Sequence, residues 1–145
     1  MNFLDALKIS SSGLTAQRVR MTVISSNLAN MHTTRTPEGG PYKRKDVVFS
    51  TEPVESSFSD IMRETIGAKQ YGVKVAGIVN DSKKPLLKYN PGHPDADEKG
   101  YVAIPNINMM EEMVNLLSAT RGYEANTAAI KSAKDMALKA LEIGK

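Results

Sequence analysis

The residues best suited to metal chemistry stand close together in the second half of the chain: His93, Asp95, Asp97 and Glu98. Carboxylates at alternating positions before a glycine resemble a calcium-binding loop, in which Asp95, Asp97 and Gly100 take the first, third and sixth positions. Lys99 would then stand at a ligand position, and Asn106 would replace the terminal glutamate. The stretch therefore predicts a proline-containing turn that leads into a strand, and not a metal site.

Catalytic chemistry finds no further support in the residue types. The two histidines, His32 and His93, have no evident nucleophile near them in the sequence. Cysteine is absent, so the chain has no thiolate nucleophile, thiolate metal site or disulfide. A phosphate-binding loop of the Gly-x-x-x-x-Gly-Lys type is missing as well. We therefore expect a protein that is not an enzyme, with no cofactor and no small-molecule substrate.

A basic run, Lys43-Arg44-Lys45, follows a Gly-Gly-Pro turn. Nucleic-acid binders usually gather their positive charge into a patch. This chain instead spreads 19 basic and 16 acidic residues along its length, for a net charge of +3. We expect no nucleic-acid partner, and two alternatives remain for the run: a solvated turn or strand edge, or a contact with a neighbouring subunit.

Two long amphipathic helices, one at each end of the chain, are predicted to hold these segments in place. In the first, over residues 3–30, apolar residues recur every seven positions and others widen the stripe: Leu7, Leu14, Met21 and Leu28, then Leu4, Ala16, Val23 and Ile24. A seam this narrow is typical of a coiled coil, and Asn2 can cap the helix start. Because so little of the helix is strongly apolar, it needs a partner.

The second helix is predicted over residues 108–143, after Pro105. Asn108 followed by Glu111 resembles a capping box. The apolar stripe has spacings of three, four or seven and consists of Met109, Met113, Leu116, Ala119, Tyr123, Ile130, Ala133, Ala137 and Leu141. We interpret Met109, Met110 and Met113 as core residues, in a core that two chains can share.

The middle of the chain, residues 31–106, is rich in proline and glycine, and short alternating stretches lie between these breaks. Strands are predicted over residues 45–50, 71–79, 86–89 and 101–104. For residues 56–66 a short helix and a disordered stretch both remain open.

These elements predict an α+β fold, in which long N- and C-terminal helices pack as a coiled-coil-like pair around a small β-rich, loop-rich insert. Residues 1–30 and 107–145 would form one discontinuous domain, and residues 31–106 the insert. Aromatic residues make up only 6% of the chain and tryptophan is absent. This composition favours a chain that buries much of its surface against neighbours.

Four ordered motifs give the chain a family resemblance. SSNLANMHTT, at 25–34, resembles the Asn-Leu-Ala-Asn-x-x-Thr signature of bacterial flagellar rod and hook proteins. ATRGYEAN, at 119–126, resembles the Arg-x-Tyr-Glu-x-Asn signature of their C-terminal helix. RTPEGGPYKRK, at 35–45, and HPDADEKGYV, at 93–102, look like the proximal-rod branch of these proteins.

The resemblance implies a structural subunit of the proximal rod in the flagellar basal body. The terminal helices would polymerise into a helical tube around the export channel and form a rod-core domain. Copies of the chain, other rod proteins, the basal ring and the export gate would be its partners. The segment at residues 1–5 lacks the basic and apolar regions of a signal peptide. This agrees with type III export to the periplasmic rod without cleavage.

The motifs and the stripes give the candidate interface residues. On the first helix these are Leu7, Leu14, Met21, Ile24, Asn27, Leu28 and Asn30. On the second they are Met113, Leu116, Arg121, Tyr123, Glu124, Asn126, Ile130 and Leu141. In the insert they are Pro41, Tyr42, Lys43 and Arg44.

Each polar candidate has a simpler interpretation. Asn27 and Asn30 can serve as C-terminal caps and turn residues, or their amides can bond a neighbouring helix and fix its register. Arg121 and Glu124 can form a solvated pair or a subunit contact. A non-polymerising helical-hairpin adaptor or export chaperone is the alternative function.

Overall fold

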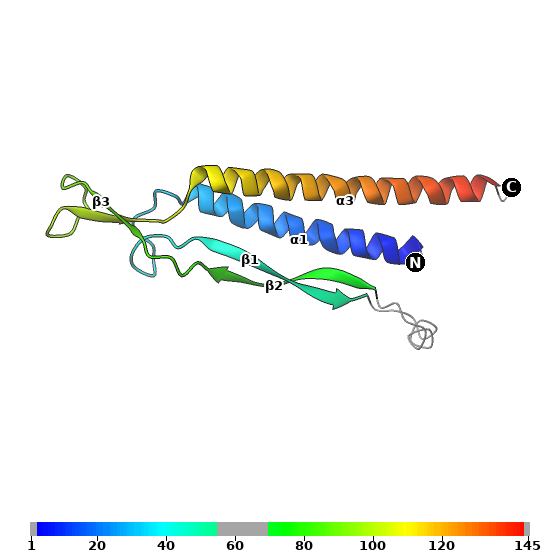
Figure 1. Ribbon diagram of the computed structural model, residues 1–145, viewed down its shortest axis with the longest axis horizontal. Helices are drawn as coiled ribbons and strands as arrows, with labels where there is room; N and C mark the ends of the chain where they lie inside the picture. The colour runs from blue at the N-terminus through cyan, green and yellow to red at the C-terminus, as the bar shows by residue number, and fades with distance from the viewer. Residues whose placement is uncertain (1–2, 55–69, 144–145) are drawn as a thin grey trace. The chain divides into compact units, whose positions relative to one another are not determined.

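The computed structural model describes residues 3–54 and 70–143 of the chain (Figure 1). Its elements, in chain order, are α1 (Phe3–Ala29), β1 (Lys45–Pro53), β2 (Tyr71–Asn80), β3 (Leu86–Tyr89), β4 (Tyr101–Ile104) and α3 (Met109–Ile143). Two long helices therefore enclose a small antiparallel β insert in the sequence, and the predicted α+β class is confirmed. The alternatives for residues 56–66 and the cap at Asn2 lie outside the described residues.

Local signals set the ends of both helices. At the end of α1, the Asn30 N–H donates to the Ser26 carbonyl oxygen at 3.1 Å, and a turn follows. At the start of α3, the Asn108 side-chain oxygen accepts the Met110 N–H at 3.0 Å, as an N-cap does. Glu111 and Glu112 fill the first turn, where negative charge suits the helix dipole. Within the described ranges, neither helix is apolar enough over a sufficient length to cross a bilayer.

The strands form two separate pairs, β1 with β2 and β3 with β4. In the second pair Leu86 lies opposite Ile104, and Tyr89 opposite Tyr101. The two tyrosine rings meet edge to face, with centroids 5.4 Å apart. The strands over 86–89 and 101–104 are confirmed at both ends, whereas β1 continues beyond residue 50 to Pro53.

The segment between β3 and β4 is a series of turns, as predicted. The Asp97 side-chain oxygen accepts the N–H groups of Lys99 and Tyr101 at 3.0 and 2.7 Å, and the His93 Nδ1 atom accepts the Asp95 N–H at 3.1 Å. Gly100 closes the segment with a φ of 79°, a left-handed conformation that suits glycine. These polar groups therefore hold the turn itself.

The chain divides into two compact units. Unit 1 consists of Met1–Val19, Phe49–Ala76 and Ala119–Lys145, and unit 2 of Arg20–Val48 and Gly77–Ser118. Each unit takes a part of both helices and a part of β1 and β2. The small core of unit 1 includes Ala16, Ala119 and Ala133, whereas unit 2 buries Val23, Ile24 and Val102 together with two polar residues.

The helices bury only some of the residues of the predicted apolar stripes. On α1 the predicted heptad of Leu7, Leu14, Met21 and Leu28 is only half-buried. The positions of α1 with full burial are Ala16, Val23, Ile24 and Asn27. On α3 the interpretation of Met109, Met110 and Met113 as core is wrong for the single chain, because all three are exposed. Besides Val23 and Ile24, the residues buried on the two helices are small or polar, namely Ala16, Asn27, Glu112, Ala119 and Ala133.

Candidate functional site

A buried asparagine at the end of α1 lies at the centre of a polar cluster in unit 2. Asn27 is fully buried, and its Nδ2 atom donates to the Lys45 carbonyl oxygen at 2.8 Å and to Glu112 Oε2 at 3.0 Å. Its Oδ1 atom accepts the Lys45 N–H at 2.9 Å and the Tyr42 hydroxyl at 3.1 Å. A carboxamide offers two donors and two lone pairs. All four are used, so Asn27 fits this position in one orientation.

The partner of Asn27 on α3 is a buried carboxylate. The Glu112 side chain is 1% exposed, and its Oε1 atom accepts the Arg44 Nε–H at 2.8 Å. Arg44 also reaches Asp46 at 3.2 Å and Asp81 at 3.9 Å from its Nη1 atom. Burial alone would lower the pKa of Arg44, but hydrogen bonds to Glu112 and Asp46 outweigh it and raise the pKa above its usual value. The guanidinium therefore stays charged and neutralises the buried carboxylate.

We call Asn27, Tyr42, Arg44 and Glu112 the polar joint, because they tie several elements of unit 2 together. The Tyr42 hydroxyl also lies 3.3 Å from the Ser26 hydroxyl of α1, and the Tyr42 N–H donates to the Thr33 carbonyl oxygen. The Arg44 carbonyl oxygen accepts the Asp81 N–H at 2.7 Å, just beyond the end of β2. The joint thus holds the end of α1, the start of β1 and the first turn of α3 at fixed distances.

The chemistry of the joint is that of a support and not of a reaction. The Asn27 carboxamide uses all its donors and acceptors on protein groups, and each oxygen of Glu112 accepts a hydrogen bond from another residue of the joint. Removing one partner of such a buried pair costs about 3–5 kcal/mol, because the other charge stays buried and uncompensated. Among residues 3–54 and 70–143, no three acidic or histidine side chains gather closely enough to hold a metal.

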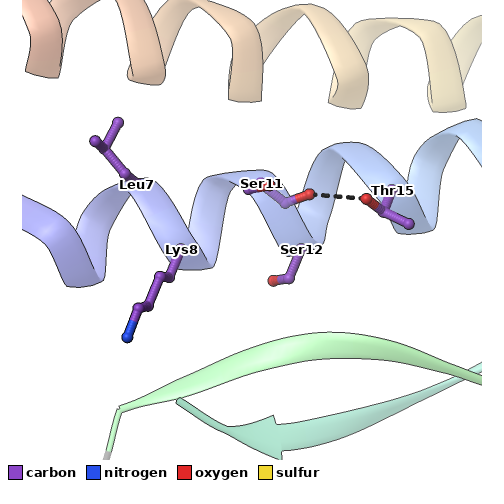
Figure 2. A pocket seen from close by; sticks show the side chains of 5 residues that line it. All are labelled: Leu7, Lys8, Ser11, Ser12 and Thr15. Carbon is purple, nitrogen blue, oxygen red and sulfur yellow. Dashed lines mark hydrogen bonds between the residues drawn. The ribbon is translucent and has the colours of Figure 1, made fainter. Parts of the chain in front are cut away.

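Unit 1 has an open groove along α1, lined by Leu7, Lys8, Ser11, Ser12 and Thr15 (Figure 2). The Thr15 hydroxyl donates to the Ser11 carbonyl oxygen at 3.2 Å. The Ser12 hydroxyl donates to the Ile9 carbonyl oxygen at 2.7 Å and accepts the Val73 N–H of β2 at 3.0 Å. The hydroxyls therefore serve the helix and its contact with the strand, and the groove combines no acid with a base.

Comparisons with known proteins agree on one family. A family model described as "Flagella basal body rod protein" matches residues 7–35, and one described as "Flagellar basal body rod FlgEFG protein C-terminal" matches residues 98–143. The chain is 48% identical to the flagellar basal-body rod protein FlgC of Bacillus subtilis over the full length of both. It is 44% identical to FlgC of Borreliella burgdorferi, over 99% of this chain and 98% of the relative. The chain belongs to the FlgC family.

Membership of the FlgC family confirms the prediction of a structural basal-body rod subunit, and it does not favour the adaptor or chaperone alternative. The polar joint takes residues from both matched segments, Asn27 from the first and Glu112 from the second. Tyr42 and Arg44 lie between these segments.

The structure assigns different roles to the two asparagines of the N-terminal motif. Asn27 bonds Glu112 on a neighbouring helix, and this helix belongs to the same chain. Asn30 instead forms the turn after α1: its Nδ2 atom donates to the Ser26 carbonyl oxygen at 2.9 Å, and its Oδ1 atom accepts the Thr33 hydroxyl at 3.2 Å. Asn30 therefore serves as a turn residue in this FlgC-family chain, whereas the Asn27 amide bonds a helix of its own chain, and a role of either in subunit contacts stays a prediction.

The other polar candidates divide between the inside and the outside of the chain. Tyr42 and Arg44 belong to the joint, whereas Lys43 is exposed. On α3, Arg121, Tyr123 and Glu124 are exposed, and Asn126 is turned toward α1 within unit 1. Among the apolar candidates, Met113 and Leu141 are exposed, Ile24 is buried, and the others are half-buried: Leu7, Leu14, Met21, Leu28, Leu116 and Ile130. Pro41 is also half-buried.

Glu112 is the joint residue that the sequence patterns do not find. Acidic residues are common in the first turn of a helix, where they interact with the helix dipole. The sequence therefore gives no reason to expect that Glu112 is buried. A signal was available in the spacing: Glu112, Ala119, Asn126 and Ala133 recur every seven residues. Ala119 and Ala133 belong to the predicted stripe and are buried, and Glu112 and Asn126, at the same spacing, contact α1.

Proposed function

We propose that this FlgC-family chain polymerises in the proximal rod through the outward faces of α1 and α3. One observation carries the proposal: large apolar side chains are exposed along α3 and at the start of α1, while most of the buried residues of the two helices are alanines or polar residues. The exposed set on the helices is Phe3, Leu4, Met109, Met110, Met113, Val114, Leu117, Tyr123, Met136, Leu138 and Leu141. Met110 and Leu141 are 69% and 70% exposed.

The energetics favour assembly over a larger monomer core. Full burial of one leucine or methionine side chain contributes about 1.5–3 kcal/mol. A few of these contacts in each subunit are enough to hold a polymer in which every copy repeats them. Met110, Val114 and Leu117 are spaced by about one helical turn on α3 and so present one continuous apolar face.

The predicted interface residues enter this proposal in two ways. Met113, Tyr123 and Leu141 would contact neighbours directly, and Arg121 and Glu124 would form polar contacts beside them, since all five are exposed. Leu7, Leu14, Met21, Leu28, Leu116 and Ile130 would contribute their half-exposed edges. The buried residues would act indirectly, because they hold α1 and α3 in the arrangement that neighbours recognise.

We extend the proposal to the domain roles and the partners. The two helices would form the rod core, and residues 31–106 would set the position of the subunit in the rod. Its partners would be copies of itself, other rod proteins, the basal ring and the export gate, reached by type III export without a cleaved signal. We also propose that the chain catalyses no reaction, since the histidine–aspartate pair seen among the described residues, His93 and Asp95, serves a turn.

The test uses a flagellated bacterium that lacks its own copy of the gene. The variants Met113→Lys and Leu117→Lys place a charge on the exposed face of α3, and Ser50→Lys places the same side chain at an exposed polar position of β1. We expect all three purified proteins to unfold at the wild-type temperature. Only the two helix variants should be missing from isolated basal bodies and leave the cells non-motile. Normal incorporation of both helix variants would contradict the proposal.

A further inference from the structure

The two glycines inside the helices face carboxamides on the opposite helix. A Cβ atom on Gly13 of α1 would lie 3.0 Å from the Nδ2 and Oδ1 atoms of Asn126 on α3. A Cβ atom on Gly122 of α3 would lie 3.3 Å from the Cδ and Nε2 atoms of Gln17 on α1. All four residues belong to unit 1. At these two points an added Cβ atom fits only if the facing amide moves by a few tenths of an ångström.

The arrangement is reciprocal. Gly13 and Gln17 are four residues apart on α1, and Gly122 and Asn126 are four residues apart on α3, so each helix presents one gap and one amide on the same face. The antiparallel pairing places each amide in the other helix's gap. The Asn126 Nδ2 atom donates to the Gly122 carbonyl oxygen at 2.8 Å, which fixes the side chain in the inserted position.

Only one register places an amide of the opposite helix against each of the two glycines. A slip of one turn in one direction sets Gln17 against Asn126, so that two amides compete for the same space. A slip of one turn in the other direction sets Gly13 against Gly122 and leaves a gap between the helices. The facing pair of the polar joint in unit 2 has the same register. The residue numbers of Asn27 and Glu112 add to the same total as those of Gly13 and Asn126, and as those of Gln17 and Gly122.

We infer that Gly13, Gln17, Gly122 and Asn126 form a glycine–amide lock that selects the register of α1 against α3 and thereby positions the outward faces for rod assembly. The part of this inference that concerns rod assembly rests on the proposed function. The lock works by shape: glycine weakens a helix relative to alanine, and this chain places a glycine inside each helix where the opposite amide needs the space. The four residues are positioning residues, since the contacts between them are within the chain.

The lock should reverse the usual effect of a glycine-to-alanine substitution on stability. The first test measures this effect in the full-length protein. Alanine inside a helix normally raises stability, but Gly13→Ala and Gly122→Ala should lower the melting temperature by about 3 °C or more, because the new Cβ atom meets the facing amide. The double variants Gly13→Ala with Asn126→Ala, and Gly122→Ala with Gln17→Ala, should recover part of the loss. Gly77→Ala serves as the matched control, since nothing lies within 4 Å of its added Cβ atom.

The second test asks whether the register matters for assembly. The variants are produced in cells at a temperature where circular dichroism shows each purified protein to be folded. Gly13→Ala should then enter basal bodies at less than about a third of the wild-type level, and the Gly13→Ala, Asn126→Ala pair should restore it. A raised melting temperature in Gly13→Ala would overturn the lock. Normal incorporation of folded Gly13→Ala, despite a lowered melting temperature, would overturn its role in positioning.

The two proposals fail separately. If Met113→Lys abolishes incorporation while Gly13→Ala changes neither stability nor incorporation, the lock is refuted and the helical interface stands. If Met113→Lys and Leu117→Lys incorporate normally, the interface is refuted. A lowered melting temperature in Gly13→Ala that is relieved by the second substitution would still support the register selection inside the chain.

Discussion

A single-atom change at the centre of the polar joint should destabilise the protein through charge repulsion. The substitution Asn27→Asp keeps the shape of the side chain but replaces the Nδ2 donor by an oxygen. That atom lies 3.0 Å from Glu112 Oε2 in the wild type. The variant therefore sets two carboxylate oxygens in contact inside a buried site, and the Lys45 carbonyl oxygen loses its donor as well.

The size of the effect follows from the distance. Two unit charges 3 Å apart repel by about 5 kcal/mol at an effective dielectric constant of about 20. Arg44 offsets part of this repulsion, because its Nε–H still bonds the other oxygen of Glu112. Small movements reduce it further. We therefore expect a loss of about 2–4 kcal/mol in the free energy of unfolding, which includes the lost donor at Lys45.

Urea unfolding followed by far-UV circular dichroism measures this loss, and a double-mutant cycle identifies its cause. In Asn27→Asp with Glu112→Gln, the new amide can donate to the new carboxylate, so the polarity of the contact is reversed and the repulsion removed. The double variant should regain more than half of the loss, with an unchanged dependence on urea concentration. A change below about 0.5 kcal/mol in Asn27→Asp, or a cycle with no coupling, would refute the assignment of Asn27 and Glu112 as direct partners.

Three further predictions concern single positions. Arg44→Ala should lower the free energy of unfolding by about 3–5 kcal/mol, because Glu112 stays buried without its cation, and Arg44→Lys should recover less than half in the same urea titration. Gln17→Met should raise stability by about 1 kcal/mol, because the Gln17 Oε1 atom is buried and accepts no hydrogen bond from the described part of the chain; a loss of stability would show that this oxygen has a partner in solution. Asn108→Ala should cost about 1 kcal/mol and loosen the first turn of α3 in hydrogen exchange, since it removes the cap on the Met110 N–H.

The sequence predicts the elements well because their signals are local. The strand at residues 86–89 lies between Pro85 and the turn residues after Tyr89, and both strands of this pair are found at the predicted positions. Asn108 marks the start of α3 for the same reason, since a cap acts within its own turn. The resemblance, which uses short motifs along the whole chain, predicts the family correctly.

The seam of the helix pair could not be predicted from the same kind of signal. Periodicity shows which residues share a face, but burial depends on the distance between the helices and on their register, and both are set by contacts over a long stretch of sequence. The apolar residues Leu7 and Met113 lie on the predicted apolar stripes, yet Leu7 is only half-buried and Met113 is exposed. Glu112 is charged and lies outside the predicted apolar stripe, yet it is buried, because Asn27 and Arg44 donate hydrogen bonds to its carboxylate.

The choice of residues in the seam connects the fold with assembly. Alanines such as Ala16, Ala119 and Ala133 are buried between the helices, and each contributes much less hydrophobic stabilisation than an exposed Leu117 or Leu141 would contribute if it were covered. A buried ion pair adds little net stability, because desolvation offsets its attraction. The single chain therefore gains a defined register from the joint and the lock but only modest stability. The larger apolar contribution is left for neighbouring subunits, as the proposed assembly through the outward faces of α1 and α3 requires.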